Sequence, residues 1–290
     1  MRYYLGVDGG GTKTEFVWIN EKDEVVCREI LGTSNPNDIG KEQMIADMVA
    51  SVCKNMPEDA HLVNVCMGLS GLGFSGAKED LRSALQNIEK VDKVDVCSDV
   101  QIALDSAYEG DGCIVIIGTG SVGYLRKNGK HILVGGCGYI IDSSLSGYDL
   151  GREVLNAVCS AKDGRSEKTF LTELVISKTG KTESDLVCET YVKGKAYVAS
   201  FAPYVFEAYE QGDSVAKDIL VRRMKEWENL LLGVYKAYGE ECCEITLIGG
   251  LTKRWDILSK FISQPINEKI SFKIPTQAVV HGALNRAKRL

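Results

Sequence analysis

Glycine gathers at a few points of this chain, where apolar runs of strand length come to an end. The clusters span residues 6–11, 68–76, 110–123, 135–151 and 249–250. Glycine adopts backbone conformations closed to other residues and lets a ligand approach the main chain. The remaining composition, 44% hydrophobic and 26% charged, excludes a flexible linker or a collagen repeat. The pattern therefore predicts an ordered sheet protein whose turns can hold a ligand.

The length and charge limit the classes of protein to which the chain can belong. Its 290 residues suffice for two domains. A net charge of −6 without a basic block argues against nucleic acid as a partner. No apolar stretch reaches the ~20 residues of a membrane span, and a strand pattern begins at once at Tyr3. We expect a cytoplasmic protein without signal peptide or membrane anchor.

The 10 cysteines do not form a recognisable framework. There is no Cys-x-x-Cys, and Cys66, Cys97 and Cys113 lie in apolar runs, where a reduced cysteine behaves as a small hydrophobic residue. With 3 histidines, no metal-ligand spacing can be assembled. We expect reduced, structural thiols.

The first third of the chain alternates between strand and helix patterns. Strands are predicted at 3–8, 14–20, 24–31, 61–69 and 93–97, and helices at 38–55, 77–88 and 100–108. Three strands joined by hairpins, followed by strand, helix, strand and helix, are typical of a mixed sheet covered by helices.

A similar order restarts near Cys113. Strands are predicted at 113–117, 123–126, 131–134, 244–248 and 270–274, with a hairpin turn at Asn128-Gly129. The pattern over 146–238 is mainly helical, and further helices are predicted at 255–262 and from Gln277. We predict an α/β fold of two similar lobes, residues 1–112 and 113–275, with a helical insertion in the second.

The first glycine turn resembles a P-loop but fits a hairpin better. Thr12 is one residue too many for Gly-x-x-x-x-Gly-Lys-Ser/Thr, and residues 15–19 favour a strand where a P-loop opens a helix. Glycine N–H groups, hydroxyls and a lysine at the tip of such a hairpin can still hold phosphate. The candidates are Gly10, Gly11, Thr12, Lys13 and Thr14. The alternative is a tight turn whose glycines only supply positive φ angles.

Asp8 directly precedes these glycines. A carboxylate repels phosphate unless a divalent cation lies between them, so Asp8 predicts bound Mg²⁺. The design repeats at the second glycine turn, formed by Gly118, Thr119, Gly120 and Ser121. Gly249 and Gly250 follow a third strand, where the backbone can approach a nucleoside.

Four segments in order carry a family resemblance: Asp8-Gly-Gly-Gly-Thr-Lys-Thr14, Ser98-Asp99, Gly118-Thr-Gly-Ser121 and Ile248-Gly-Gly250. They resemble the actin-like ATPase fold shared with sugar kinases, and more narrowly the N-acetylglucosamine kinase branch of the BadF/BadG/BcrA/BcrD ATPase family. The resemblance implies two ribonuclease H-like lobes with an interlobe cleft, and a final helix, 276–290, that packs back onto the first lobe. It also implies phosphorylation of an amino sugar, at the 6-hydroxyl, by ATP with Mg²⁺, and it leaves a homodimer open.

The resemblance also assigns residues. Asp99 is the expected catalytic base, although an aspartate there can equally cap the helix beginning at Val100. The expected substrate contacts are Asn35, Asp99, Thr119, Gly136, Cys137, Asp142 and Ser143. For Asn35, an ordinary Asn-Pro turn is a strong alternative.

One loop departs from the family pattern and leaves the substrate open. Cys137 stands where the resembled kinases have tryptophan, and residues 142–146 replace their acidic run, so another amino sugar or a muramic-type sugar remains possible. Two other functions stay open. One is an ATPase that activates dehydratases through an iron–sulfur cluster, with Cys137 as the nearest ligand candidate. The other is an ATP-binding sensor without turnover.

Overall fold

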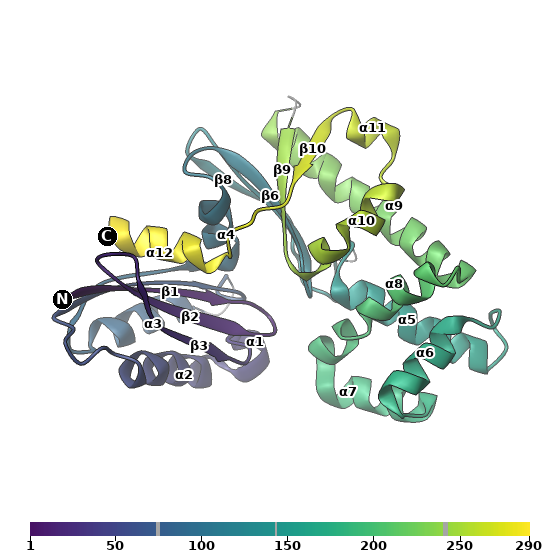
Figure 1. Cartoon of the computed structure of the whole chain (residues 1–290), viewed down its shortest axis with the longest axis horizontal. Helices are drawn as coiled ribbons and strands as arrows, with labels where there is room; N and C mark the ends of the chain where they lie inside the picture. Colours follow the sequence, from purple (N-terminus) through teal and green to yellow (C-terminus); the bar gives the residue numbers. More distant parts are fainter. Residues whose placement is uncertain (74–75, 143, 240–242) are drawn as a thin grey trace. The chain divides into compact units, whose positions relative to one another are not determined.

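The computed structural model describes residues 1–73, 76–142, 144–239 and 243–290. These residues form two compact units, drawn with their helices and strands in Figure 1. Unit 1 comprises Met1–Gly110 together with Pro275–Leu290, and unit 2 comprises Asp111–Ile274. Each unit contains one mixed sheet.

The sheet of unit 1 has the strand order β3-β2-β1-β4-β5. Its strands are β1 (Arg2–Gly9), β2 (Thr14–Asn20), β3 (Val25–Leu31), β4 (Leu62–Leu69) and β5 (Val91–Ser98). β1, β2 and β3 pair antiparallel, whereas β1, β4 and β5 pair parallel. The carboxyl ends of β1, β4 and β5 therefore lie at one edge of the sheet.

Helices cover both faces of this sheet (Figure 1). They are α1 (Pro36–Ile39), α2 (Lys41–Lys54), α3 (Ala77–Gln86), α4 (Asp99–Ala107) and α12 (Val280–Arg289). α2 and α3 bury their apolar residues in one core cluster. α12 contributes to the clusters that bury Cys66 and Val17, and α4 contributes to the first of these.

Two helix predictions in this unit were wrong in extent. The single helix expected at 38–55 is divided, because Gly40 has a φ of 85° and ends α1 before α2 begins. The last helix, expected from Gln277, begins at Val280, and the N–H groups of His281 and Gly282 in its first turn donate to the carbonyls three residues earlier.

Arg286 anchors α12 to the rest of unit 1. Its Nε donates to Asp95 Oδ2 and its Nη1 to Asp105 Oδ2, both at 2.8 Å. The Asp105 side chain is only 6% exposed, so its charge depends on partners supplied by the protein. Gly282 allows the close approach of the helix, because a Cβ there would lie 1.9 Å from the carbonyl oxygen of Ile102.

Replacing Arg286 by alanine should therefore destabilise unit 1. We expect the free energy of unfolding to fall by about 3 kcal/mol, because a buried carboxylate loses its guanidinium partner. Urea denaturation of the whole chain measures the change. Arg289→Ala, on the exposed side of the same helix, should cost less than about 0.5 kcal/mol. Equal losses in the two variants would contradict the anchoring role.

The sheet of unit 2 repeats the plan, with strand order β10-β9-β6-β7-β8. Its strands are β6 (Gly112–Ile117), β7 (Ser121–Lys127), β8 (Lys130–Gly135), β9 (Cys243–Ile248) and β10 (Ile270–Lys273). β6 pairs antiparallel with β7 and parallel with β9, as β1 does with β2 and β4. Asn128 and Gly129 form the predicted turn, with φ angles of 51° and 73°. The expectation of two similar α/β lobes is confirmed.

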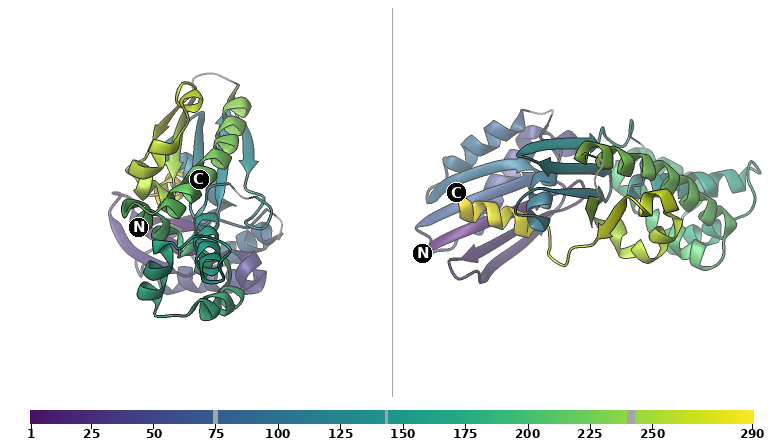
Figure 2. Two further views of the ribbon diagram at one scale, coloured as in Figure 1. Left: turned by 90° about the vertical axis from the view of Figure 1, so that its right-hand side faces the viewer. Right: turned by 90° about the horizontal axis from the view of Figure 1, so that it is seen from above.

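The helical insertion of unit 2 lies between β8 and β9 in the chain. It consists of α5 (Gly147–Lys162), α6 (Phe170–Thr179), α7 (Glu183–Ala199), α8 (Ala202–Glu210) and α9 (Ser214–Tyr238). Figures 1 and 2 show α5, α6, α7 and α8 gathered at one end of the sheet. Among the described residues, no helix combines the length and the apolar character needed to cross a bilayer.

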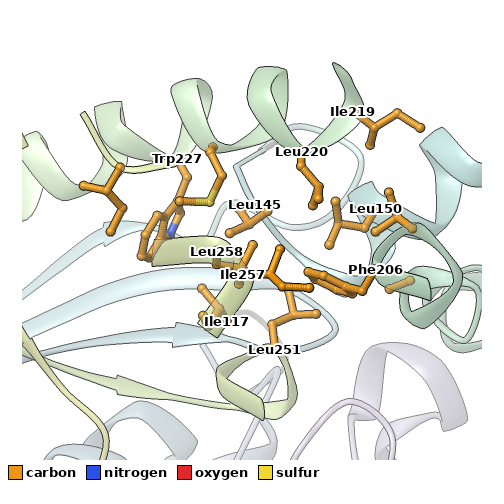
Figure 3. Close-up of a cluster of buried hydrophobic side chains, with 14 of the residues drawn as sticks. Ile117, Leu145, Leu150, Phe206, Ile219, Leu220, Trp227, Leu251, Ile257 and Leu258 are labelled. Atoms are coloured by element: carbon orange, nitrogen blue, oxygen red, sulfur yellow. The ribbon is translucent and has the colours of Figure 1, made fainter. Parts of the chain in front are cut away.

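The segment after β9 is more broken than the helix predicted at 255–262. It contains the 3₁₀ helix η1 (Gly250–Arg254), α10 (Trp255–Leu258), the 3₁₀ helix η2 (Ser259–Phe261) and α11 (Gln264–Asn267). Leu251, Ile257 and Leu258 of this segment point into the main core of unit 2, opposite Trp227 of α9 (Figure 3). Packing on that core, rather than a continuous helical stripe, fixes these short turns.

Candidate active site

The first glycine turn is the predicted hairpin between β1 and β2. Asp8 pairs with Glu15 and Gly9 with Thr14, and the N–H of Gly10 donates to the Lys13 carbonyl at 2.9 Å. Gly10 and Gly11 are half-buried, whereas Thr12 and Lys13 are exposed at the tip. The tip therefore presents backbone, a hydroxyl and an ammonium group, the set expected of a phosphate-binding turn.

Thr14 does not belong to this exposed set. It is completely buried, and its hydroxyl donates to the carbonyl of Gly32 at 2.9 Å. The expectation that Thr14 binds phosphate therefore disagrees with the structure: this side chain fastens the base of the hairpin to the residue after β3.

Two carboxylates lie at the edge where the parallel strands of unit 1 end. Asp8 is the penultimate residue of β1, and Asp99 directly follows β5. β4 pairs with both strands, with Gly68 opposite Asp8 and Leu69 opposite Ser98. The fold thus brings together two acidic residues that are far apart in the sequence.

Both carboxyl groups bind protons more tightly than usual. Burial raises the pKa of Asp8 to about 7, helped by the negative charges of Asp99 and Glu15. Burial also raises the pKa of Asp99 to about 6. Mg²⁺ prefers oxygen ligands such as carboxylates. The raised pKa values show that too little positive charge lies nearby to stabilise the ionised forms of these two groups, and a bound cation would supply it. The two residues therefore fit the predicted Mg²⁺.

Asp99 begins α4, but it is not the N-cap residue of this helix. Ser98 is the N-cap residue, and its N–H donates to Gln101 Oε1 at 3.1 Å in a capping box. Asp99 is the first helical residue, and its Oδ1 accepts from the adjacent N–H of Val100 at 2.9 Å. The N-cap position of α4 is therefore held by Ser98 and not by Asp99.

Asn35 has the local role that its Asn-Pro sequence allowed. It is the N-cap of α1, and its Oδ1 accepts from the N–H of Asn37 at 2.9 Å. The side chain is 8% exposed. Since the oxygen caps the helix, the amide nitrogen is the atom of Asn35 that can serve a ligand.

Two glycines of the cluster at 68–76, for which no role was predicted, lie close to these groups. A Cβ on Gly68 would lie 2.4 Å from Ile102 of α4, and one on Gly71 would lie 2.2 Å from Asn35 Oδ1. Gly71 also has a φ of 79°. These glycines allow α4 and the Asn35 turn to approach the end of β4.

In unit 2, the turn between β6 and β7 is short and closed. Ile117 pairs with Ser121, and the N–H of Gly118 donates to the Gly120 carbonyl at 2.9 Å. Ser121 is 8% exposed, and its hydroxyl has no hydrogen-bond partner among the described residues. A buried hydroxyl without a partner at a glycine turn fits a ligand that supplies an acceptor.

Gly249 and Gly250 lie beside the base of this turn. β9 runs parallel to β6, with Ile248 opposite Ile116. Gly249 has a φ of 114°, and a Cβ there would lie 2.6 Å from the carbonyl oxygen of Ile117. Gly250 is exposed, with open space around it. The exposed backbone of Gly250 thus lies beside the second glycine turn.

The predicted sugar loop follows β8 and is shaped by Asp142. Asp142 Oδ2 accepts from the N–H groups of Gly136 at 2.6 Å and Cys137 at 3.4 Å. The carboxylate therefore folds the loop, and Cys137 is exposed at its surface. Ser143 lies outside the described residues.

Tyr139 lies in the loop predicted to contact the sugar, 135–139, but was not itself assigned a substrate contact. Its ring lies 4.7 Å from that of Tyr148, and its side chain is 38% exposed. Lys195 Nζ lies 5.9 Å from the ring centroid. The loop thus has an exposed aromatic ring two residues after Cys137. This residue could have been proposed as a sugar contact from the sequence alone.

Among the described residues, one further set of possible metal ligands was not predicted: the sequence indicated Asp8 as a metal ligand and no site formed by cysteines. Cys66, Asp95 and Cys97, on neighbouring strands, place their ligand atoms within 4.8 Å of one another. However, the Arg286 guanidinium already binds Asp95, and a hydrogen bond with Cys97, together with burial, raises the pKa of the Cys66 thiol. A thiol that holds its proton and a carboxylate that is already paired are poor metal ligands, so we assign no metal to this set. All described cysteines are free.

Comparison with known proteins identifies relatives. The N-acetylmuramic acid/N-acetylglucosamine kinase of Clostridium acetobutylicum is 33% identical over 239 residues, which cover 78% of this chain and 77% of that protein. The N-acetyl-D-glucosamine kinase of Dictyostelium discoideum is 29% identical over 289 residues, covering 91% and 90%. The structure of a candidate N-acetylglucosamine kinase from Chromobacterium violaceum has the same fold, with a TM-score of 0.80 over 99% of both chains at 22% identity.

The sequence model of one family extends over both units. It matches residues 5–285, and so includes both glycine turns, Asp99 and the loop after β8. With this match, the chain belongs to the BadF/BadG/BcrA/BcrD ATPase family.

Proposed function

We propose that this chain transfers the γ-phosphoryl group of ATP to a hydroxyl of an amino sugar, the 6-hydroxyl of a sugar of the N-acetylglucosamine type. The observation that carries the proposal is the buried Asp99, with a raised pKa, at the strand edge that also holds Asp8. The names of the relatives support amino sugars as the substrate class.

Asp99 is the proposed base. Its carboxylate accepts the proton of the sugar hydroxyl as that oxygen bonds to the γ-phosphorus, and the bond from phosphorus to the ADP oxygen breaks with its electrons leaving on ADP. A pKa of about 6 suits this task, since the group is ionised at neutral pH yet more basic than an ordinary aspartate.

The two glycine turns are the proposed phosphate ligands. Gly10, Gly11, Thr12 and Lys13 offer donors in unit 1, and Gly118, Thr119, Gly120 and Ser121 offer donors in unit 2. Gly249 and Gly250 are the proposed nucleoside contact. Phosphoryl transfer needs mainly such positioning and neutralisation of charge.

Asp8 is the proposed magnesium ligand. Its carboxylate lies near that of Asp99, whose charge helps to raise its pKa to about 7, and a cation would relieve this repulsion. Bound Mg²⁺ would neutralise part of the phosphate charge of ATP.

The proposed sugar contacts are Asn35, through its amide nitrogen, Asp99, Thr119 and the loop after β8. In that loop, the N–H groups of Gly136 and Cys137 are occupied by Asp142, so Asp142 contributes mainly by shaping the loop. We add Tyr139, whose exposed ring can lie against the apolar face of a sugar.

Measuring ADP release with a panel of sugars tests the proposal. We expect kcat/KM for N-acetylglucosamine, glucosamine or N-acetylmuramic acid to exceed that for glucose by about tenfold or more, because a site that bonds the amino substituent loses these bonds with glucose. ADP release without sugar is the background control. A chain that binds ATP but responds to no sugar would support the sensor alternative instead.

A further inference from the structure

The first turn of α5 is bonded directly to the glycine turn between β6 and β7. The N–H of Gly147 donates to the carbonyl of Gly118 at 2.7 Å, and the N–H of Tyr148 donates to the carbonyl of Thr119 at 3.1 Å. First-turn N–H groups have no partner inside their own helix. Here α5 uses two of them to hold consecutive peptides of the turn.

These bonds set the direction of the next N–H groups. In a planar trans peptide, the C=O of one residue and the N–H of the next point in opposite directions. With the Gly118 and Thr119 carbonyls directed at α5, the N–H groups of Thr119 and Gly120 point away from it. Those are the two amides at the tip of the turn, next to the unpartnered hydroxyl of Ser121.

The contact leaves little room for a side chain at position 147. A Cβ on Gly147 would lie 3.1 Å from the Gly118 carbonyl oxygen and 3.7 Å from Thr119 Cα. The segments on either side cannot easily yield, because Ile117, Leu145 and Leu150 point into the same core cluster (Figure 3) and are fully buried. We therefore expect an added methyl group to displace the turn by a few tenths of an ångström.

We propose that Gly147 is a positioning residue for ATP: it lets α5 orient the peptides of the turn so that the Thr119 and Gly120 N–H groups meet a phosphate. This rests on the proposed function in so far as ATP binds the turn. Gly147 touches no substrate and acts through Gly118 and Thr119.

Gly147→Ala tests the proposal by ADP binding, measured calorimetrically, and by thermal unfolding of the same protein. Displacing the turn by a few tenths of an ångström should raise the Kd for ADP about three- to tenfold. The melting temperature should not fall in parallel, because alanine is a better helix former than glycine. A Gly147→Ala chain that binds ADP as tightly as the unmodified chain would overturn the proposal.

Gly151→Ala is the matched control. It lies one turn further along α5, where a Cβ would be 1.8 Å from the Val198 carbonyl oxygen and far from the glycine turn. We expect a lower melting temperature with the Kd for ADP unchanged within about twofold. If Gly151→Ala does not fold, Gly233→Ala in α9 replaces it, since its methyl would meet only Val134 Cγ1 at 2.9 Å.

Affinity losses that follow stability in all variants would also overturn the proposal, whereas an unmodified chain that binds no ADP contradicts the proposed function itself.

Discussion

Asp99→Asn should lower kcat for sugar phosphorylation by about a thousandfold, the size of effect expected when a general base is lost. Asparagine keeps the shape of the side chain and can still accept the N–H of Val100, so the start of α4 should be preserved. The Kd for ADP should stay within about twofold, because Asp99 is assigned to the acceptor hydroxyl rather than to the nucleotide. ADP release and calorimetric ADP binding on one preparation measure both quantities.

Asp80→Asn is the control that separates a catalytic role from the stabilising effect of any acidic residue in the first turn of a helix. Asp80 also lies in the first turn of a unit 1 helix, α3, and its half-exposed side chain pairs with Lys41 Nζ at 2.9 Å. Its loss should leave kcat unchanged. Near-normal turnover of Asp99→Asn, or equal effects of the two variants, would remove Asp99 as the base.

The pH dependence gives Asp99 a second test. The reactive form is the carboxylate, and its pKa is raised to about 6 by burial. With Mg²⁺ saturating, so that the metal keeps Asp8 ionised, kcat/KM of the unmodified chain for the sugar should rise as the pH increases towards 6 and level off above it, falling about tenfold per pH unit on the acid side. The residual activity of Asp99→Asn should lack this acid limb.

The parts of the fold that the sequence predicts correctly are those governed by local patterns. Both hairpin turns follow from glycine between β-forming runs, and the repeated lobe follows from the order in which these runs recur. Gly40 shows the limit of this reasoning. The apolar spacing of the predicted helix at 38–55 continues through it, whereas its positive φ ends α1 there.

The candidate site was predicted less completely, because much of it depends on contacts between distant segments. The sequence suggests Thr14 as a phosphate ligand, whereas in the structure its hydroxyl donates to the Gly32 carbonyl. Gly71 and Gly147 have no evident role in the sequence. In the structure, Gly71 contacts Asn35, and Gly147 lets the start of α5 contact Gly118. None of these partners can be read from spacing along the chain, since only the sheet and the helices packed on it bring them together.

Asp8→Asn should lower turnover at limiting Mg²⁺ by about a hundredfold and raise the Mg²⁺ concentration for half-maximal activity, since it removes the proposed metal oxygen. Without metal, at pH 8, the effect on the nucleotide should have the opposite sign. Asp8, with a pKa of about 7, is then ionised and repels phosphate, so Asp8→Asn should bind metal-free ADP at least as tightly as the unmodified chain.

Glu15→Gln is the control for a simple loss of negative charge near the turn. Glu15 lies opposite Asp8 in β2 and also raises its pKa, but its carboxylate is paired with Arg28, at 3.3 Å, and with Lys13, at 3.8 Å, and is not a proposed metal ligand. Removing that charge should leave the Mg²⁺ requirement within about twofold, because the Asp8 oxygen remains. If Asp8→Asn and Glu15→Gln shifted the Mg²⁺ dependence equally, the cation would be responding to the general field of the turn, and Asp8 would not be its ligand.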